Sequence, residues 1–157
     1  MSWSLSISGG DINIGGLNGL GRVTGRQKLV QDLKCWILES VGTDPLHPEF
    51  GSTLDGGEMA DGTVVDGVIG QVIGNEVLLQ IESELLRVLN AYRENQIKIL
   101  DNEQSTYSGQ TSLTPDEILL SINNVEVSPF STTVVARISI TTAANSQIVF
   151  TQPVGEL

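Results

Sequence analysis

The chain has 157 residues, of which 39% are hydrophobic and 17% charged, and its 19 acidic and 8 basic residues give a net charge of −11. This length suits one compact domain, with or without an extended arm, and the composition is too apolar for a disordered chain. The acidity argues against binding to nucleic-acid phosphates or anionic membranes and favours solubility or a basic partner surface. The short apolar runs predict neither a membrane span nor a signal peptide.

The N-terminal 25 residues are rich in glycine. Residues 4–8 and 11–14 alternate polar and apolar side chains around Gly9 and Gly10, which predicts a small hairpin or an extended arm. The glycines within residues 15–21 are not followed by a Lys-Ser/Thr pair, so a phosphate-binding loop is not predicted. We therefore divide the chain into an arm over residues 1–25 and a single domain over residues 26–157.

Apolar residues at three- and four-residue spacing predict an amphipathic helix over residues 27–41, which Gly42 and Pro45 would terminate. The only cysteine, Cys35, lies inside this helix, and no base flanks it in sequence. We expect it to pack rather than to react, and a single cysteine excludes an intrachain disulfide and favours a reducing compartment.

The following segment, residues 42–62, reads as a stiff loop that Phe50 and Leu54 would anchor to the core. His47 could act as a base for Ser52 with Asp44 as its orienting partner, but no strand-turn-helix elbow presents the serine. A single histidine also excludes a multi-histidine zinc site. Three acidic residues could ligate calcium, although they lack the EF-hand spacing, namely Asp55, Glu58 and Asp61.

A long helix is predicted over residues 65–92, because apolar residues from Leu78 to Tyr92 follow the spacing of a coiled-coil seam. Leu79 and Leu86 widen this stripe, so one side could dock a partner helix. The first half of the helix contains three glycines that could form a groove for another backbone, pack on the first helix or mark a late helix start, namely Gly67, Gly70 and Gly74. We favour the last two interpretations, since glycine destabilises a helix interior.

Beyond Tyr92 the period changes to two. The pattern predicts a strand at 96–100, a loop at 101–114 and a capping box at 114–117 that begins a helical turn through 120, unless 118–120 already begin a strand. A strand fragment follows at 125–127, and residues 134–141 and 147–151 form a hairpin around a turn at 143–146. The predicted fold class is α+β, with two helices, one of them long, on a small and mostly antiparallel sheet.

An acidic protein invites a carboxylate-pair hypothesis. Glu49 with Glu94 or Asp55 could serve a glycosidase, which needs one buried carboxyl group of raised pKa. Sugar sites usually carry aromatic platforms, and this chain is only 4% aromatic. We assign no catalytic, cofactor or metal residue and expect no enzyme; a weaker alternative is an acidic adaptor domain.

Taken together, the run at residues 26–33, the amphipathic helix, Gly42 and a Phe-Gly-Ser-x-Leu loop resemble the small baseplate wedge protein, or sheath initiator, of contractile-tailed phages. The resemblance extends over about residues 5–150. The loop residues that carry it are Pro48, Glu49, Phe50, Gly51, Ser52 and Leu54. The family commonly has Glu-Pro-Arg between the long helix and the next strand, whereas this chain has Glu94-Asn95-Gln96 there, directly after Arg93.

The resemblance implies a structural subunit of the virion tail baseplate, assembled in the host cytoplasm and present in several copies around a ring. The alternative under the same resemblance is a small acidic muramidase that acts on peptidoglycan during tail penetration. Its implied partners are sheath subunits and wedge proteins, with the tail tube or hub as a further candidate, and neither nucleic acid nor membrane. Wedge proteins would bind Arg93, Glu94, Asn95 and Gln96. The first sheath ring would add by strand augmentation to the C-terminal hairpin, comprising Val134, Val135, Ala136, Arg137, Ile138, Ser139, Ile140, Gln147, Ile148, Val149 and Phe150.

Overall fold

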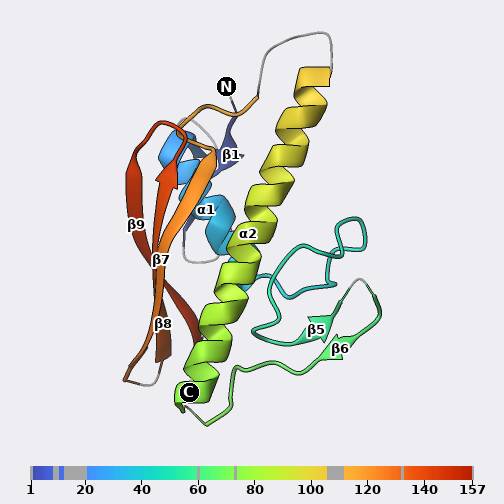
Figure 1. Cartoon of the computed structure of the whole chain (residues 1–157), viewed down its shortest axis with the longest axis vertical. Helices are drawn as coiled ribbons and strands as arrows, with labels where there is room; N and C mark the ends of the chain where they lie inside the picture. Colours follow the sequence, from blue (N-terminus) through green and yellow to red (C-terminus); the bar gives the residue numbers. More distant parts are fainter. Residues whose placement is uncertain are drawn as a thin grey trace.

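The computed structural model describes residues 2–8, 11–12, 21–59, 61–72, 74–105, 112–131 and 133–156. Its described part has the predicted α+β fold, in which two helices pack on a three-stranded antiparallel sheet and three two-stranded ribbons complete the structure (Figure 1). The helices are α1 (Gly25–Leu38) and α2 (Asn75–Ser105). The strands are β1 (Ser4–Leu5), β2 (Ile7–Ser8), β3 (Asp11–Ile12), β4 (Arg22–Val23), β5 (Gly57–Glu58), β6 (Val64–Val65), β7 (Leu119–Phe130), β8 (Thr133–Thr142) and β9 (Gln147–Glu156).

The three-stranded sheet has the order β7-β8-β9. Residues 143–145 form the loop between β8 and β9, where the Thr142 N–H donates to the Ser146 carbonyl at 3.0 Å and Asn145 adopts a positive φ of 56°. A three-residue loop with a left-handed third residue is a common hairpin connection. The predicted C-terminal hairpin is therefore confirmed, and both of its strands are longer than predicted.

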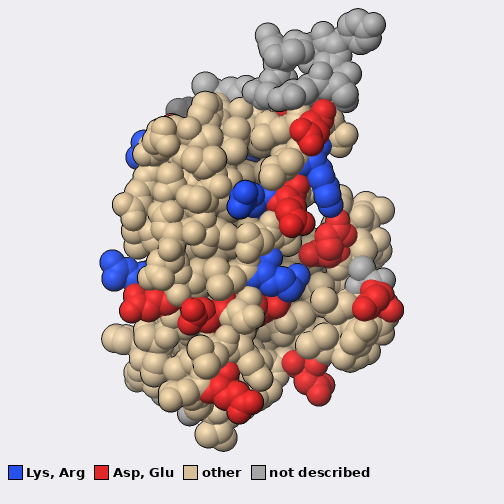
Figure 2. Space-filling model, viewed as in Figure 1, with Lys and Arg blue, Asp and Glu red and all other residues tan. Residues whose placement is uncertain are grey.

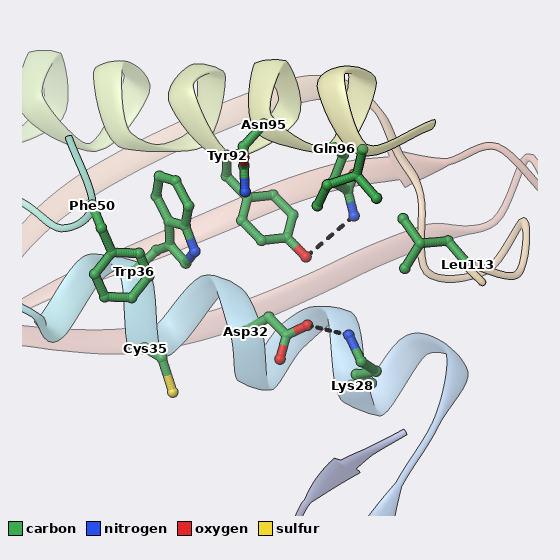
Figure 3. Close-up of a pocket in the computed structure, with 10 residues that line it drawn as sticks. Lys28, Asp32, Cys35, Trp36, Phe50, Tyr92, Asn95, Gln96 and Leu113 are labelled. Atoms are coloured by element: carbon green, nitrogen blue, oxygen red, sulfur yellow. Dashed lines mark hydrogen bonds and ion pairs between the residues drawn. The ribbon is translucent and has the colours of Figure 1, made fainter. Parts of the chain in front are cut away.

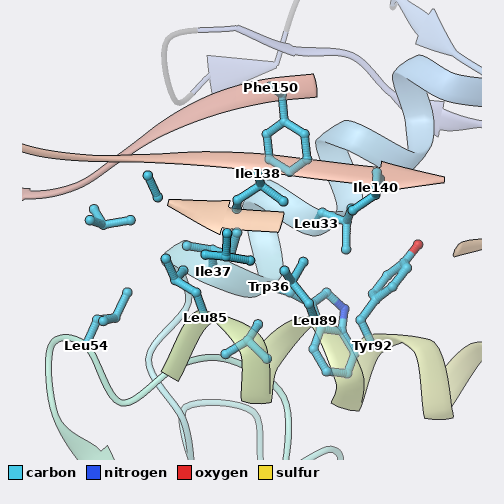
Figure 4. Close-up of a cluster of buried hydrophobic side chains, with 14 of the residues drawn as sticks. Leu33, Trp36, Ile37, Leu54, Leu85, Leu89, Tyr92, Ile138, Ile140 and Phe150 are labelled. Atoms are coloured by element: carbon cyan, nitrogen blue, oxygen red, sulfur yellow. The ribbon is translucent and has the colours of Figure 1, made fainter. Parts of the chain in front are cut away.

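One hydrophobic core lies between the two helices and one face of the sheet (Figure 4). Strand residues at every second position contribute to it, as a half-buried sheet requires, and Ala136, Ile138 and Ile140 are completely buried. Trp36 of α1 makes edge-to-face contacts with Phe50 and Tyr92, at centroid distances of 4.7 and 5.4 Å. These rings join the two helices to the loop between them.

Helix α1 begins two residues earlier than predicted, at Gly25, and also ends three residues earlier than predicted, at Leu38. Gly42 therefore is not its C-terminal stop. It occupies a tight turn with a φ of +80°, where a Cβ atom would collide with the Glu58 carbonyl oxygen. At the other end, Thr24 makes no side-chain cap. Instead the Gly25 N–H donates to Glu117 Oε1 at 3.0 Å, so a distant carboxylate caps the helix.

Helix α2 covers a different range from the predicted one. Val64–Val65 form strand β6, and the glycines at 67, 70 and 74 precede the helix, so the late-start interpretation is confirmed. The prediction of a strand at residues 96–100 is wrong, because the helix continues to Ser105. Tyr92 and Gln96 are both buried and lie one helical turn apart. The buried face of the helix therefore continues past the predicted end at Tyr92, and its next residue is the polar Gln96.

Residues 114–117 form a turn rather than a helix. The Glu117 carboxylate accepts from the Thr114 N–H at 2.8 Å, as in a capping box, but strand β7 begins at Leu119. The alternative of an early strand start is therefore correct. In the arm, β2 pairs with β3 and β1 with β4. The predicted strand positions 13–14, the glycine loop at 15–20 and residues 106–111 of the predicted loop lie outside the described residues.

Candidate functional site

The outer edge of β9 is the most open backbone edge of the three-stranded sheet. Paired residues in an antiparallel ladder alternate between hydrogen-bonded and non-hydrogen-bonded pairs. Counting from the Thr142–Ser146 bond through a regular register, the backbone N–H and C=O groups of Gln147, Val149 and Thr151 point away from β8. No other described strand pairs with β9. These groups could therefore pair with an incoming strand.

Proline sets the limit of this edge. Pro153 lies opposite Val135, at a position whose nitrogen faces away from β8 by the same alternation, and proline is tolerated in a sheet at such an edge position. Because Pro153 has no N–H to offer, the row of outward donors ends before it. The open edge therefore covers residues 147–151.

The opposite edge of the sheet, on β7, is blunted. Its register shifts twice, between Leu119 and Ser121 and again before Asn124, and Pro129 lies near its end. At its start, the Leu119 N–H donates to Gln96 Oε1 of α2 at 2.9 Å. Bulges, proline and coverage are the devices by which proteins protect an edge strand. On β9 such devices lie only at its end, where Pro153 and a register shift opposite Val134 and Val135 follow the stretch at residues 147–151.

The structure corrects the expectation that both hairpin strands offer an edge. Strand β8 pairs with β7 on one side and with β9 on the other, so its backbone is used within the chain. Several of the expected sheath-binding residues also belong to the core, namely Val134, Ala136, Ile138, Ile140 and Phe150. Of the expected residues, Gln147 and Val149 keep outward-facing backbone groups at the open edge, while the backbone groups of Ile148 and Phe150 face β8.

A groove of about 580 Å³ borders this edge. One wall consists of β9 at residues 148–150, and the other consists of α1 and the arm. Gln31 of α1 fixes the arm, because its Nε2 donates to the Leu5 carbonyl at 2.7 Å and its Oε1 accepts from the Ile7 N–H at 2.9 Å. The described residues that line it are Ser6, Ile7, Val23, Arg26, Gln27, Val30, Gln31, Lys34, Ile148, Val149 and Phe150. The α1 and arm walls were missed from the sequence, because their contribution depends on the packing of α1 against β9.

A second cavity, of about 300 Å³, lies between α1 and α2 (Figure 3). Tyr92 and Gln96 reach toward it from α2, and the Lys28–Asp32 ion pair of 2.6 Å lies on the α1 side. Gln96 Nε2 donates to the Tyr92 hydroxyl at 3.2 Å. Burial, and next the Asp32 charge, raise the pKa of Tyr92, so this hydroxyl keeps its proton. Two pairs of polar side chains in the cavity, Tyr92 with Gln96 and Lys28 with Asp32, therefore bond within the chain.

The expected wedge-binding residues lie in the middle of α2 and not at a helix–strand junction, so that placement is wrong. Arg93 and Glu94 are exposed. Gln96 is buried, and besides its bond to the Leu119 N–H its Nε2 donates to the Glu117 carbonyl at 2.7 Å. Gln96 therefore joins α2 to the start of β7 and is not available to a partner.

The Phe-Gly-Ser-x-Leu loop is used inside the fold. Ser52 is buried, where its hydroxyl donates to the Ile37 carbonyl and its N–H to the Glu39 carbonyl, both at 2.7 Å. Arg87 of α2 donates to the Gly51 carbonyl at 3.0 Å and forms an ion pair with Glu84, which accepts from the Thr53 N–H. The loop thus fastens the end of α1 to α2, while Pro48 is half-buried and Glu49 is exposed.

The hypothetical catalytic relay is not assembled. The His47 and Asp44 side chains meet at 2.9 Å in the exposed part of the loop, and this bond lowers the pKa of Asp44. The Ser52 hydroxyl, however, is buried and donates to the Ile37 carbonyl. It therefore has neither exposure to a substrate nor a bond to the histidine.

The hypothetical carboxylate pairs and the calcium site also find no support in the geometry. Glu49, Glu94 and Asp55 are all exposed, so none of them is the buried carboxyl group that such a pair requires. Within the described residues, no group of three His, Cys, Asp or Glu side chains could hold a metal ion. Cys35 is half-buried, and burial followed by the charges of Asp32 and Glu39 raises the pKa of its thiol.

The surface agrees with the acidic composition. On the face drawn in Figure 2, acidic side chains are scattered and the few basic ones lie among them, with no continuous basic stripe on that face. Among the described residues, neither helix combines the length and apolarity needed to cross a bilayer. No family model, curated protein or solved structure matches the chain.

Proposed function

We propose that this protein is a structural subunit of a contractile tail baseplate, which joins wedge proteins to the tail tube and templates the first ring of sheath subunits. In this proposal, a strand of the sheath subunit adds to the open edge of β9. Main-chain hydrogen bonds would supply affinity, and the neighbouring groove would supply specificity. Several copies around a ring would strengthen a modest single contact.

The observation that carries the proposal is the contrast between the two edges of one sheet. The β7 edge has two register shifts, a proline and a covering glutamine. The β9 edge has an unprotected stretch at residues 147–151 beside a groove. Since an unprotected edge invites aggregation, its retention on one side only favours a strand-shaped partner. The motif resemblance supplies the identity of that partner.

A proline at Val149 tests the proposal, because it removes one outward N–H and leaves the bonds from β9 to β8 intact. Val149→Thr is the matched control, since it changes the same exposed side chain and keeps the N–H. Each variant would be mixed with purified sheath subunits and tail tubes and imaged by negative-stain microscopy. We expect sheath to grow from one tube end with the wild type and with Val149→Thr, and not with Val149→Pro.

Folding of the proline variant is verified by circular dichroism and by its urea midpoint, which should stay close to that of the wild type. Sheath growth that is unchanged by a folded Val149→Pro protein would refute strand addition at β9. Growth that needs no added protein would refute the templating role altogether. Peptidoglycan hydrolysis that Glu49→Gln or Glu94→Gln abolishes would favour the muramidase alternative.

A further inference from the structure

The groove beside β9 has a charge opposite to that of the whole protein. The chain contains 19 acidic and 8 basic residues. Yet the described residues that line the groove include two cations, Arg26 and Lys34, and no acidic side chain. A local reversal of charge next to an open strand edge indicates which sign of charge the groove accommodates.

The two cations are not equivalent. Arg26 already pairs with Asp116 at 3.1 Å and donates to the Ser146 hydroxyl at 2.7 Å, next to the start of β9. Lys34 is half-buried, two helical turns or about 12 Å further along α1. Among the described residues, no acidic side chain forms an ion pair with Lys34. Lys34 is therefore the cation that a partner can use.

The rest of the groove is mainly apolar. Ile7, Val23 and Val30 come from the arm and α1, and Ile148 and Phe150 come from β9. A strand that continues the sheet presents every second side chain to one face, so one of its faces would lie over these residues. Apolar side chains on that face would bury against them, and a charged one would meet Lys34.

We infer that the strand that adds to β9 carries an acidic side chain between apolar ones on the face that it turns toward α1. This inference rests on the proposed strand addition and specifies the partner's chemistry. Lys34 pairs with the acidic side chain, and a basic side chain at that position is disfavoured. Gln31 takes no part in this recognition, because its amide is occupied by Leu5 and Ile7 of the arm.

Two synthetic peptides test the inference with the intact protein. Each is a capped, fluorescein-labelled chain of seven residues that alternates Thr and Val, in which the central Val is replaced by Asp in one peptide and by Lys in the other. Affinities are measured by fluorescence anisotropy at low and at high salt. We expect the wild type to prefer the Asp peptide by about fivefold, the range of an exposed ion pair, and salt to reduce this preference.

Lys34→Glu should reverse the preference, and Lys34→Gln should remove it. Lys98→Glu is the matched control, because it makes the same change of net charge at an exposed lysine on α2 and should preserve the preference. Equal binding of both peptides to the wild type, binding of neither, or a preference that survives in Lys34→Glu overturns the inference. Failure of strand addition is recognised separately, since Val149→Pro would then leave the affinity for both peptides unchanged.

Discussion

Replacement of Glu117 by Gln tests how the start of β7 holds α1 and the arm in place. The residue is 1% exposed, and its carboxylate accepts from three separate parts of the chain. The donors are the Thr114 N–H at 2.8 Å, the Gly25 N–H at 3.0 Å and the Ser2 hydroxyl at 3.2 Å. Glutamine has the same shape, but it offers one acceptor oxygen where the carboxylate offers two.

The magnitude follows from these contacts. The glutamine NH₂ group must face a donor that the carboxylate satisfied, and a buried polar group left without a partner costs about 1–3 kcal/mol. Loss of the negative charge at the N-terminus of α1 costs a further 0.3–1 kcal/mol, roughly. We therefore expect Glu117→Gln to lower the free energy of unfolding by about 3 kcal/mol at neutral pH.

The same contacts predict the pH dependence of this difference. Burial raises the pKa of Glu117, but the N–H groups of Thr114 and Gly25 and the Ser2 hydroxyl outweigh it, so the pKa lies below its ordinary value of 4.5. A carboxyl group with a lowered pKa stabilises the fold above its unfolded pKa, and this stabilisation is lost as the pH falls through the folded value. The difference between wild type and variant should therefore be constant above about pH 5.5 and shrink below pH 4.5.

Urea unfolding followed by the fluorescence of buried Trp36 measures both quantities. Asp116→Asn is the control, since this neighbouring carboxylate is exposed and pairs with exposed Arg26, which predicts a change below about 1 kcal/mol. A Glu117→Gln protein within about 0.5 kcal/mol of the wild type at neutral pH would refute the reasoning. So would a larger difference that does not decrease in acid.

Two further predictions concern the first helix and the loop after it. Gly51→Ala should destabilise the protein by more than about 2 kcal/mol in urea unfolding, because Gly51 has a φ of +103° and a Cβ atom would lie 2.6 Å from the Glu39 carbonyl oxygen. Gly62→Ala, with a φ of +82° and open space around it, should cost about 1 kcal/mol, and equal losses would argue against the collision. Cys35 should react with a thiol reagent at pH 8 several-fold more slowly in the folded protein than in urea, since burial raises its pKa; equal rates would contradict this.

Local sequence pattern was sufficient where one strong period governed a segment. The valine- and isoleucine-rich alternation over 134–141 and 147–151 predicted the hairpin, and the helical spacing of Leu29, Leu33 and Trp36 predicted α1. The pattern was ambiguous where polar residues are buried. In the sequence, polar Gln96 next to apolar Ile97 fits the alternation of a strand. In the structure, the side-chain amide of Gln96 is hydrogen-bonded to the Glu117 carbonyl and the Leu119 N–H, so this polar residue occupies the buried face of a helix.

The candidate site could be predicted only in part. The residues of β9 were identified from their own pattern, but strand order was not, because β7 is long and contains unfavourable residues such as Asn123, Asn124 and Pro129. Without β7 on one side of β8, both hairpin strands looked available as edges. Lys34 was missed for a similar reason, since α1 meets β9 only through contacts between residues more than a hundred positions apart.

The geometry of β9 separates recognition from stability within one strand. Phe150, Gln152 and Val154 bury their side chains on the core face. Gln147, Val149 and Thr151 have exposed side chains on the opposite face of the sheet, and their backbone groups point away from β8. Changes at the second set can therefore alter strand addition at little cost in folding, whereas changes at the first set act on the core. An edge built in this way can adapt to a partner strand while the sheet that presents it stays intact.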